Sequence, residues 1–213
     1  EFNNKLYTSL IDILEYEENK LVFGDQATQK PTNEEVGYVQ LDFFNEEEDE
    51  QKQTVDKVIE KYGKIDVFIN NAGITWYESD EDGINIKKHK EIMDTNHFGT
   101  VQCTKYALPH LLKSKGSLVG VCSIAGEVGL PNRSAYSASK FAMNGFLNSL
   151  RVQFLNKGLH VLITYVGYTS TNIRKIVKDD SKSSHFPPGY GDAVKEKGMM
   201  TPAEAATHIF NGV

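Results

Sequence analysis

Residues 117–166 have the sequence SLVGVCSIAGEVGLPNRSAYSASKFAMNGFLNSLRVQFLNKGLHVLITYV. Its two ends, residues 117–122 and 159–166, are apolar and rich in β-branched side chains, which predicts two buried strands. Between them, residues 135–155 carry apolar side chains at helical spacing, and Gly158 follows as a stop signal. The order strand, helix, strand is typical of a βαβ unit, whose strands are parallel.

The same alternation runs through the rest of the chain. Further apolar runs predict strands at residues 20–23, 36–41 and 65–69, and helical patterns cover residues 46–62, 92–112 and 201–213. The sequence therefore predicts one α/β domain over residues 1–213, with a doubly wound parallel sheet covered by helices on both faces. In such a sheet a ligand binds beyond the carboxyl ends of the strands, so the polar residues after each strand are the candidates for chemistry.

Composition excludes several classes of partner. The net charge of −6 argues against nucleic acid and anionic membranes. No apolar run approaches the roughly 18 residues of a membrane span, and the N-terminus lacks the pattern of a secretory leader. The two cysteines have no paired spacing, so we expect reduced thiols and a cytoplasmic protein. The six histidines lack metal-ligand spacing, so we expect no metal site.

Three polar features follow strands or interrupt a helix. Residues 70–73 (NNAG) follow a strand, where they either form a simple turn or let the backbone approach a flat ligand ring. Ser123 ends another strand, where its hydroxyl group either caps a helix or donates to a substrate oxygen. Asn96 stands inside a helical pattern, where it would bend the helix or hold a water molecule.

Tyr136 and Lys140 form the most informative pair. Their spacing of four places both side chains on one face of a helix. A free phenol is a poor base at neutral pH, and a neighbouring ammonium group favours its deprotonated form. Such a tyrosine can exchange a proton with an alcohol or carbonyl oxygen. The spacing of Tyr136 and Lys140 alone is weak evidence for this chemistry. It gains weight because Ser123 lies thirteen residues before Tyr136.

In this order, NNAG, Asn96, residues 123–126 (SIAG) and residues 136–140 (YSASK) resemble the short-chain dehydrogenase/reductase family. The resemblance covers the chain from about Asp42 to the C-terminus, and it implies a Rossmann-type fold. Residues 136–145 (YSASKFAMNG) are particularly similar to members that act on steroids, retinoids and other lipophilic carbonyls.

The resemblance implies an oxidoreductase that moves a hydride between NAD or NADP and a small carbonyl or alcohol substrate. Tyr136 is then the general acid/base, Lys140 supports it and binds the nicotinamide ribose, Ser123 orients the substrate oxygen, and Asn96 holds a relay water. The implied cofactor-binding set also contains Asp42, Asn70, Ala72, Gly73, Gly167, Thr169 and Thr171. Residues 171–200 correspond to a substrate lid, and the family pattern implies a homodimer or homotetramer.

Residues 1–41 depart from the family pattern. The glycine-rich loop that binds the cofactor pyrophosphate is absent from them. This leaves three explanations open: the sequence lacks its true N-terminus and with it the first strand of the family sheet, the first 40 residues have diverged, or cofactor binding has been lost. Loss of the first strand would leave unpaired backbone groups on both of its neighbours. The sequence stops at Val213, in or just after a predicted helix, so we also expect the last family strand to be missing. Asp25 either binds the adenosine ribose and favours NAD or is a turn residue. The alternative to an enzyme is a non-catalytic or truncated relative that binds no dinucleotide and serves as a binding or scaffold module.

Overall fold

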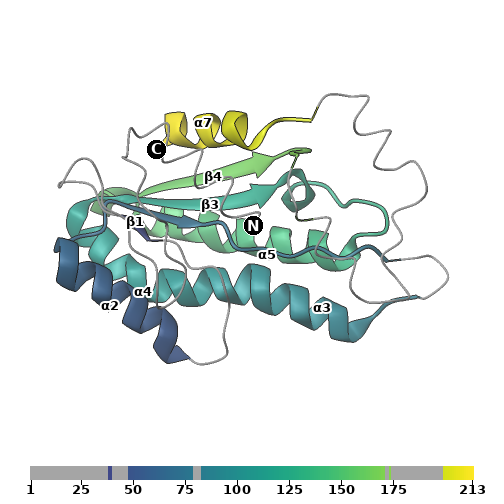
Figure 1. Ribbon diagram of the computed structural model, residues 1–213, viewed down its shortest axis with the longest axis horizontal. Helices are drawn as coiled ribbons and strands as arrows, with labels where there is room; N and C mark the ends of the chain where they lie inside the picture. The colour runs from purple at the N-terminus through teal and green to yellow at the C-terminus, as the bar shows by residue number, and fades with distance from the viewer. Residues whose placement is uncertain (1–37, 40–47, 79–82, 171–172, 174–198) are drawn as a thin grey trace.

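The computed structural model of the chain describes residues 38–39, 48–78, 83–170, 173 and 199–213 (Figure 1). Its centre is a parallel sheet in the order β1-β2-β3-β4. The strands are β1 (Tyr38–Val39), β2 (Val67–Asn70), β3 (Ser117–Ser123) and β4 (His160–Val166). The prediction of an α/β protein with a parallel sheet is confirmed.

Helices cover both faces of this sheet (Figure 1). On one face lie α2 (Glu48–Tyr62), α4 (Gly99–Ser114) and α5 (Ser134–Phe154), and α7 (Pro202–Gly212) lies on the other. The first three helices bury a large core against alternate residues of the strands, with Leu111 and Leu147 fully buried. Against the opposite face of β3, α7 packs Ala206 and Ile209. This two-sided burial explains why residues 117–122 are apolar without a polar alternation.

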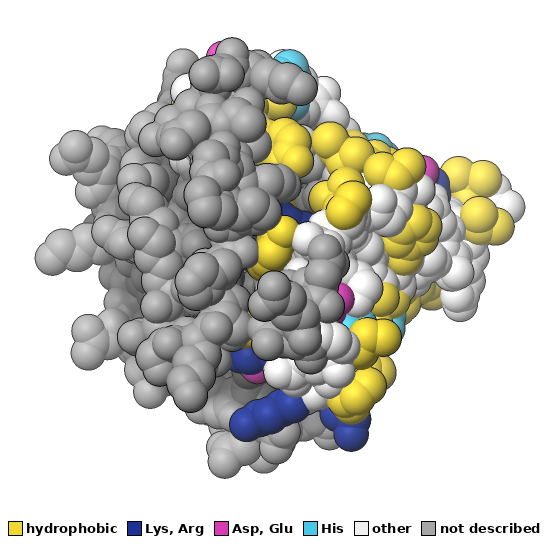
Figure 2. All heavy atoms as spheres, turned by 90° about the vertical axis from the view of Figure 1, so that its right-hand side faces the viewer, with side chains coloured by type: hydrophobic (Ala, Val, Ile, Leu, Met, Phe, Trp, Pro, Cys, Tyr) yellow, Lys and Arg dark blue, Asp and Glu magenta, His cyan; other side chains and the backbone are white. Residues whose placement is uncertain are grey.

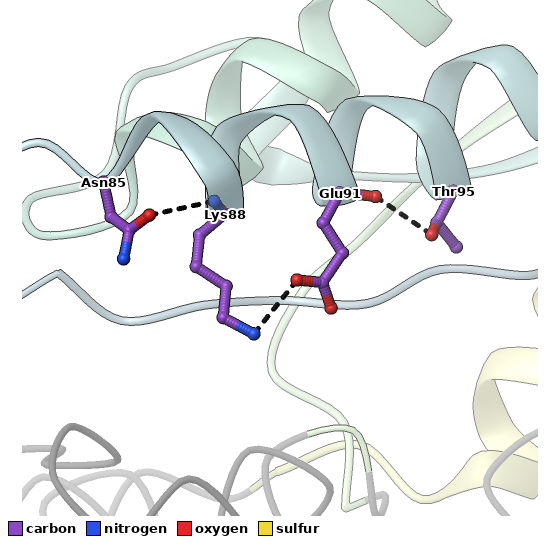
Figure 3. A network of polar contacts seen from close by, with 4 residues as sticks. All are labelled: Asn85, Lys88, Glu91 and Thr95. Atoms are coloured by element: carbon purple, nitrogen blue, oxygen red, sulfur yellow. Dashed lines mark hydrogen bonds and ion pairs between the residues drawn. The ribbon is translucent and has the colours of Figure 1, made fainter.

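The helix predicted from residue 92 begins earlier. Its first part is α3 (Ile86–Met93), and the side chain of Asn85 caps it by accepting a hydrogen bond from the Lys88 backbone N–H at 3.1 Å. Figure 3 shows this cap together with the Lys88–Glu91 ion pair and the bond from the Thr95 hydroxyl group to the Glu91 carbonyl. The exposed charged residues on this turn obscured the apolar periodicity, although the asparagine cap was a usable signal.

A π-helical turn, η2 (Asp94–Phe98), joins α3 to α4. It inserts an extra residue into the helical repeat at the position of Asn96, which is completely buried. We expected Asn96 to bend the helix or to hold a water molecule, and the structure has a π turn at this position. Such turns are frequent at functional sites.

The first described strand lies beside β2. Tyr38 pairs with Val67 and Val39 pairs with Phe68, so the first half of β2 has a partner on that side. The edge of β2 that we expected to be unpaired is therefore partly covered, because Tyr38 and Val39, from the strand predicted at residues 36–41, lie beside it. The predicted strand at residues 20–23 and the predicted lid at residues 171–200, apart from residues 173, 199 and 200, lie outside the described residues.

Two general expectations can be compared with the structure. Cys103 and Cys122 are both buried and free, as expected for reduced core thiols. None of the helices in the described ranges has the length and apolar character that crossing a bilayer requires.

Two glycines provide a test of the packing between β3 and α5. A Cβ atom at Gly120 would collide with the buried Leu147 side chain, whereas one at Gly145 would meet nothing within 4 Å. We expect Gly120→Ala to lower the free energy of unfolding by about 1–3 kcal/mol through overpacking. Gly145→Ala, inside α5, should raise it by about 0.5–1 kcal/mol because glycine disfavours helix interiors. Urea unfolding of both variants measures the difference, and equal effects would contradict this packing.

Candidate active site

A pocket of about 290 Å3 lies where β3 and β4 end. Figure 2 looks at this end of the molecule, where hydrophobic side chains gather on the described surface. The pocket is bordered by the segment after β2, the end of β3, the start of α5 and the turn after β4. Its described lining residues are Asn71, Gly73, Thr75, Val121, Cys122, Ser123, Ile124, Leu130, Arg133, Tyr136, Lys140, Val166, Gly167, Tyr168, Thr169 and Ile173.

Ser123 has the capping role, which is one of the two roles that the sequence left open. Its oxygen accepts a hydrogen bond from the Ala125 backbone N–H at 3.2 Å and so caps the short 3₁₀ turn η3 (Ile124–Gly126). Because the hydroxyl group is the acceptor in that bond, its own proton remains available to a ligand in the pocket. The cap fixes the position of the oxygen, and the free O–H can donate to a substrate oxygen.

Tyr136 and Lys140 lie on the same face of α5 and line the pocket together. The Lys140 ammonium group lies 5.9 Å from the centre of the Tyr136 ring. One of its N–H groups donates to the Val121 carbonyl at 3.0 Å, and a second makes a long contact of 3.8 Å with Met143 Sδ. An ammonium group has three donors, and the described part of the chain supplies partners for two of them. Lys140 is only 3% exposed, which strengthens its field at the phenol.

Asn96 holds the segment after β2 against α5. Its side-chain oxygen accepts from the Ile74 N–H at 2.8 Å, and its amide nitrogen donates to the Ile74 carbonyl and to Ser139 Oγ, both at 2.9 Å. Ser139 in turn donates to the Tyr136 carbonyl at 2.8 Å. The amide group of Asn96 therefore connects three chain segments, and its side chain binds protein groups.

Gly73 shows how closely these segments approach. A Cβ atom there would lie 3.3 Å from Asn96 Oδ1 and 3.5 Å from Lys140 Nζ. The glycine keeps this side of the pocket open between the asparagine and the lysine.

The start of α5 is attached to the same region by a second polar cluster. Ser134 donates to one carboxylate oxygen of Glu78 at 2.6 Å, and His89 Nε2 lies 2.7 Å from the other. Ser134 also lies 3.1 Å from that histidine nitrogen. These contacts fix the N-terminal turn of α5, two residues before Tyr136, to α3 and to the segment after β2.

The other predicted cofactor residues fall into three groups. Gly167 and Thr169 line the pocket, where the turn after β4 is held by hydrogen bonds between Tyr168, Ser170 and Met200. Asn70 and Ala72 are not among the described lining residues, and the Asn70 side chain donates to Thr104 Oγ1 at 3.1 Å, on the side of α4. Asp42 and Thr171, together with Asp25, lie outside the described residues.

Sequence reasoning missed several pocket residues. Asn71 and Thr75 line the pocket beside Gly73. Cys122 also faces it, where burial raises the pKa of its thiol group, so the sulfur stays protonated. Arg133 is the least expected, because it is charged and yet only 7% exposed. Its position three residues before Tyr136 placed it near the site, but no sequence pattern predicted its burial.

Comparison with known proteins identifies the family. The model of the family described as short chain dehydrogenase matches residues 11–182. The chain therefore belongs to the short-chain dehydrogenase/reductase family. It is 36% identical over 129 residues to dehydrogenase/reductase SDR family member 7B of Danio rerio, covering 59% of this chain and 41% of that protein. It is 38% identical over 163 residues to 11-beta-hydroxysteroid dehydrogenase-like 3 of Arabidopsis thaliana, covering 76% and 49%. The chain spans about half the length of these relatives.

Solved structures show the same fold. The ligand-free aldohexose dehydrogenase of Thermoplasma acidophilum matches with a TM-score of 0.72 at 23% identity, over 96% of this chain and 81% of that one. ElxO, described with NADP bound, matches with a TM-score of 0.67 at 27% identity, over 82% and 69%. Both likenesses agree with the Rossmann-type sheet described above.

The Asn96 cluster leads to a stability prediction. Asn96→Ala would leave several buried groups without partners, each costing about 1–3 kcal/mol, so we expect a loss of roughly 2–4 kcal/mol in unfolding free energy. Asn85→Ala is the matched control, since Asn85 caps α3, which precedes the π turn, with one exposed hydrogen bond. Chemical unfolding of both variants is the measurement. If Asn96→Ala cost no more than Asn85→Ala, the cluster would not hold the site together.

Proposed function

We propose that this protein is an NAD- or NADP-dependent oxidoreductase that interconverts a carbonyl and an alcohol, with Tyr136 as general acid/base. One observation carries the proposal. Ser123, Tyr136 and Lys140 line one pocket together with Gly73 and with the turn that contains Gly167 and Thr169. Family membership supports the reaction class, and the structure of ElxO with NADP supports the cofactor.

The described residues fit the nicotinamide end of such a cofactor. Gly73 leaves space where a side chain would crowd Asn96 and Lys140, and within the described part of the chain Lys140 has an N–H group to spare. Gly167 and Thr169 border the same space from the turn after β4. When bound, the nicotinamide ring supplies or accepts the hydride.

The proton is transferred by side chains of the protein. In the direction of reduction, Tyr136 Oη gives its proton to the carbonyl oxygen, while the Ser123 hydroxyl group donates a hydrogen bond to the same oxygen. Within the described residues no hydrogen bond occupies the Tyr136 hydroxyl group, so it is free to meet the substrate. The resulting phenolate is stabilised by the neighbouring ammonium group of Lys140. Oxidation of an alcohol runs the same steps in reverse.

Asn96, Ser134 and Glu78 contribute by positioning other parts of the site. They hold α5 and the segment after β2, so that Tyr136 and Gly73 face one space. The expectation that Asn96 holds a relay water remains a prediction. So do the homodimer or homotetramer and the cytoplasmic location.

Replacement of Tyr136 tests the proposal. Tyr136→Phe removes only the hydroxyl group, so we expect turnover to fall by about 10²–10⁴-fold while the dissociation constant for NADH or NADPH changes little. Tyr165→Phe is the control, because Tyr165 is half exposed and its hydroxyl group donates to Asn144 outside the pocket. Turnover is followed by absorbance of the reduced cofactor with a panel of carbonyl compounds, and cofactor affinity by titration calorimetry.

Two results would contradict the proposal. Full activity in Tyr136→Phe would remove the tyrosine from proton transfer. No saturable binding of either dinucleotide to the wild-type protein would favour the non-catalytic binding module instead.

A further inference from the structure

Thr75 carries a buried hydroxyl group that lacks a hydrogen-bond partner within the described part of the chain. The residue is only 7% exposed, and its Oγ1 atom is shielded from water as well. Burial of a hydroxyl group without a partner costs free energy, and most buried polar side chains are hydrogen-bonded. A ligand that completes the missing bond would explain why a hydroxyl group stands here.

The side chain of Thr75 belongs to the pocket. Asn71, Gly73 and Thr75 all line it, whereas Ile74 and Trp76 pack in an apolar cluster outside the described lining. This alternation is typical of an extended segment, whose side chains point to opposite sides in turn. Rotation about χ1 of a threonine exchanges its hydroxyl group with a methyl group of similar size. The oxygen can therefore turn toward a ligand while the backbone stays in place.

Contacts at both ends of this segment bring Thr75 to the level of Tyr136. At one end, a Cβ atom on Gly73 would lie 3.5 Å from Lys140 Nζ, one turn after Tyr136 on α5. At the other end, the Glu78 backbone N–H donates at 2.9 Å to a carbonyl of the loop just before α5. Thr75 lies between these two contacts and lines the same pocket as the tyrosine.

This position favours a contact with the substrate over one with the cofactor. Asn71 and Gly73 come earlier in the segment, directly after β2, where the nicotinamide end of the cofactor is proposed to lie. Thr75 comes after them, on the part of the segment that leads to the start of α5. Its hydroxyl group is thus placed beyond Gly73 and beside the phenol that serves the substrate oxygen.

The surroundings of this hydroxyl group make it selective. Much of the pocket lining is apolar, namely Val121, Ile124, Leu130 and Val166. In such a pocket a small number of polar groups fixes the orientation of a ligand. A ligand oxygen that pairs with Thr75 removes the cost of the unpaired hydroxyl group, whereas a ligand without that oxygen leaves the cost in place.

We propose that the Thr75 hydroxyl group binds a second oxygen of the carbonyl substrate, on the carbon next to the reacting carbonyl group. This inference rests on the proposed oxidoreductase function and names the class of its substrate, an α-hydroxy or α-oxo carbonyl compound. A hydroxyl group donates and accepts, so an alcohol oxygen and a carbonyl oxygen both fit. While Ser123 and Tyr136 bind the reacting oxygen, the second bond fixes the orientation of the substrate. Thr75 is thus a specificity-determining residue.

Matched ketones measured on matched variants test this assignment. 2-Hydroxyacetophenone and 1-phenylpropane-1,2-dione carry the second oxygen, and acetophenone and propiophenone lack it. Thr75→Val replaces the hydroxyl group with a methyl group of similar shape. We expect it to lower kcat/KM for the oxygenated ketones by about tenfold or more, and for the plain ketones by less than about twofold. Because each compound is compared between two proteins, its intrinsic reactivity cancels.

Two further variants serve as controls. Thr75→Ser keeps the hydroxyl group and should keep most of the activity on the oxygenated ketones. Thr164→Val makes the same change on β4, outside the described pocket lining, where the hydroxyl group donates to the Gly120 carbonyl at 3.3 Å. It should leave all four kcat/KM values unchanged.

Stability and cofactor binding separate this role from two others. Thr75→Val removes an unpaired polar group from the free protein, so its Tm should equal or exceed that of the wild type. The dissociation constants for NADH and NADPH should stay the same. A clear fall in Tm, or failure of the variant to fold, would assign the hydroxyl group to the fold, and weaker dinucleotide binding would assign it to the cofactor. Either result overturns the proposal.

The kinetic outcomes distinguish the substrate class from the oxidoreductase function. Equal effects of Thr75→Val on oxygenated and plain ketones would overturn the substrate class and leave the function standing. Wild-type turnover of plain carbonyl compounds, but of neither oxygenated ketone, would do the same. No turnover of any carbonyl compound by protein that binds NADH or NADPH would overturn the oxidoreductase function, and the substrate class with it.

Discussion

The site depends on one buried amide group. Asn96 lies inside a π turn between α3 and α4, where its side chain binds the backbone of Ile74 on one side and Ser139 of α5 on the other. A regular helix would carry this residue around the helix axis by a different angle, so the extra residue of the π turn is part of how the amide reaches both partners. A buried group that satisfies two backbone atoms and a hydroxyl group is costly to replace, because its loss removes the Asn96 partner of both Ile74 backbone groups and the hydrogen bond that Ser139 Oγ accepts.

Short-range contacts position the other pocket residues relative to Asn96. The segment after β2 is held so close to α5 that a Cβ atom at residue 73 would lie in tight contact with Asn96 Oδ1, at 3.3 Å, and beside Lys140 Nζ, at 3.5 Å. Lys140 is in turn fixed to the Val121 carbonyl of β3, and Ser123, two residues further along that strand, caps the following turn. The end of β3 and one helix thus place a hydroxyl group, a phenol and an ammonium group around one space, as expected at the carboxyl edge of a doubly wound sheet.

Much of this could be predicted from the sequence, because the responsible signals are local. The buried strands, the spacing of Tyr136 and Lys140 and the serine after β3 all follow from short-range patterns. The start of α3 was missed because its first turns are charged and exposed, and only Asn85 marks it. The direction of Asn70 and the burial of Arg133 depend on tertiary packing, for which no local pattern exists. The placement of β1 beside β2 is likewise a long-range result.

The most direct test of the account follows the hydride itself. The wild-type protein is incubated with a reducible carbonyl compound and with NADH or NADPH that carries deuterium at the transferable position, and the alcohol product is analysed by mass spectrometry. Because the pocket is proposed to hold the carbonyl carbon against the nicotinamide ring, the account predicts one deuterium atom bound to the carbinol carbon of each product molecule. Alcohol formed without deuterium, in the presence of fully labelled cofactor, would contradict direct hydride transfer in this pocket.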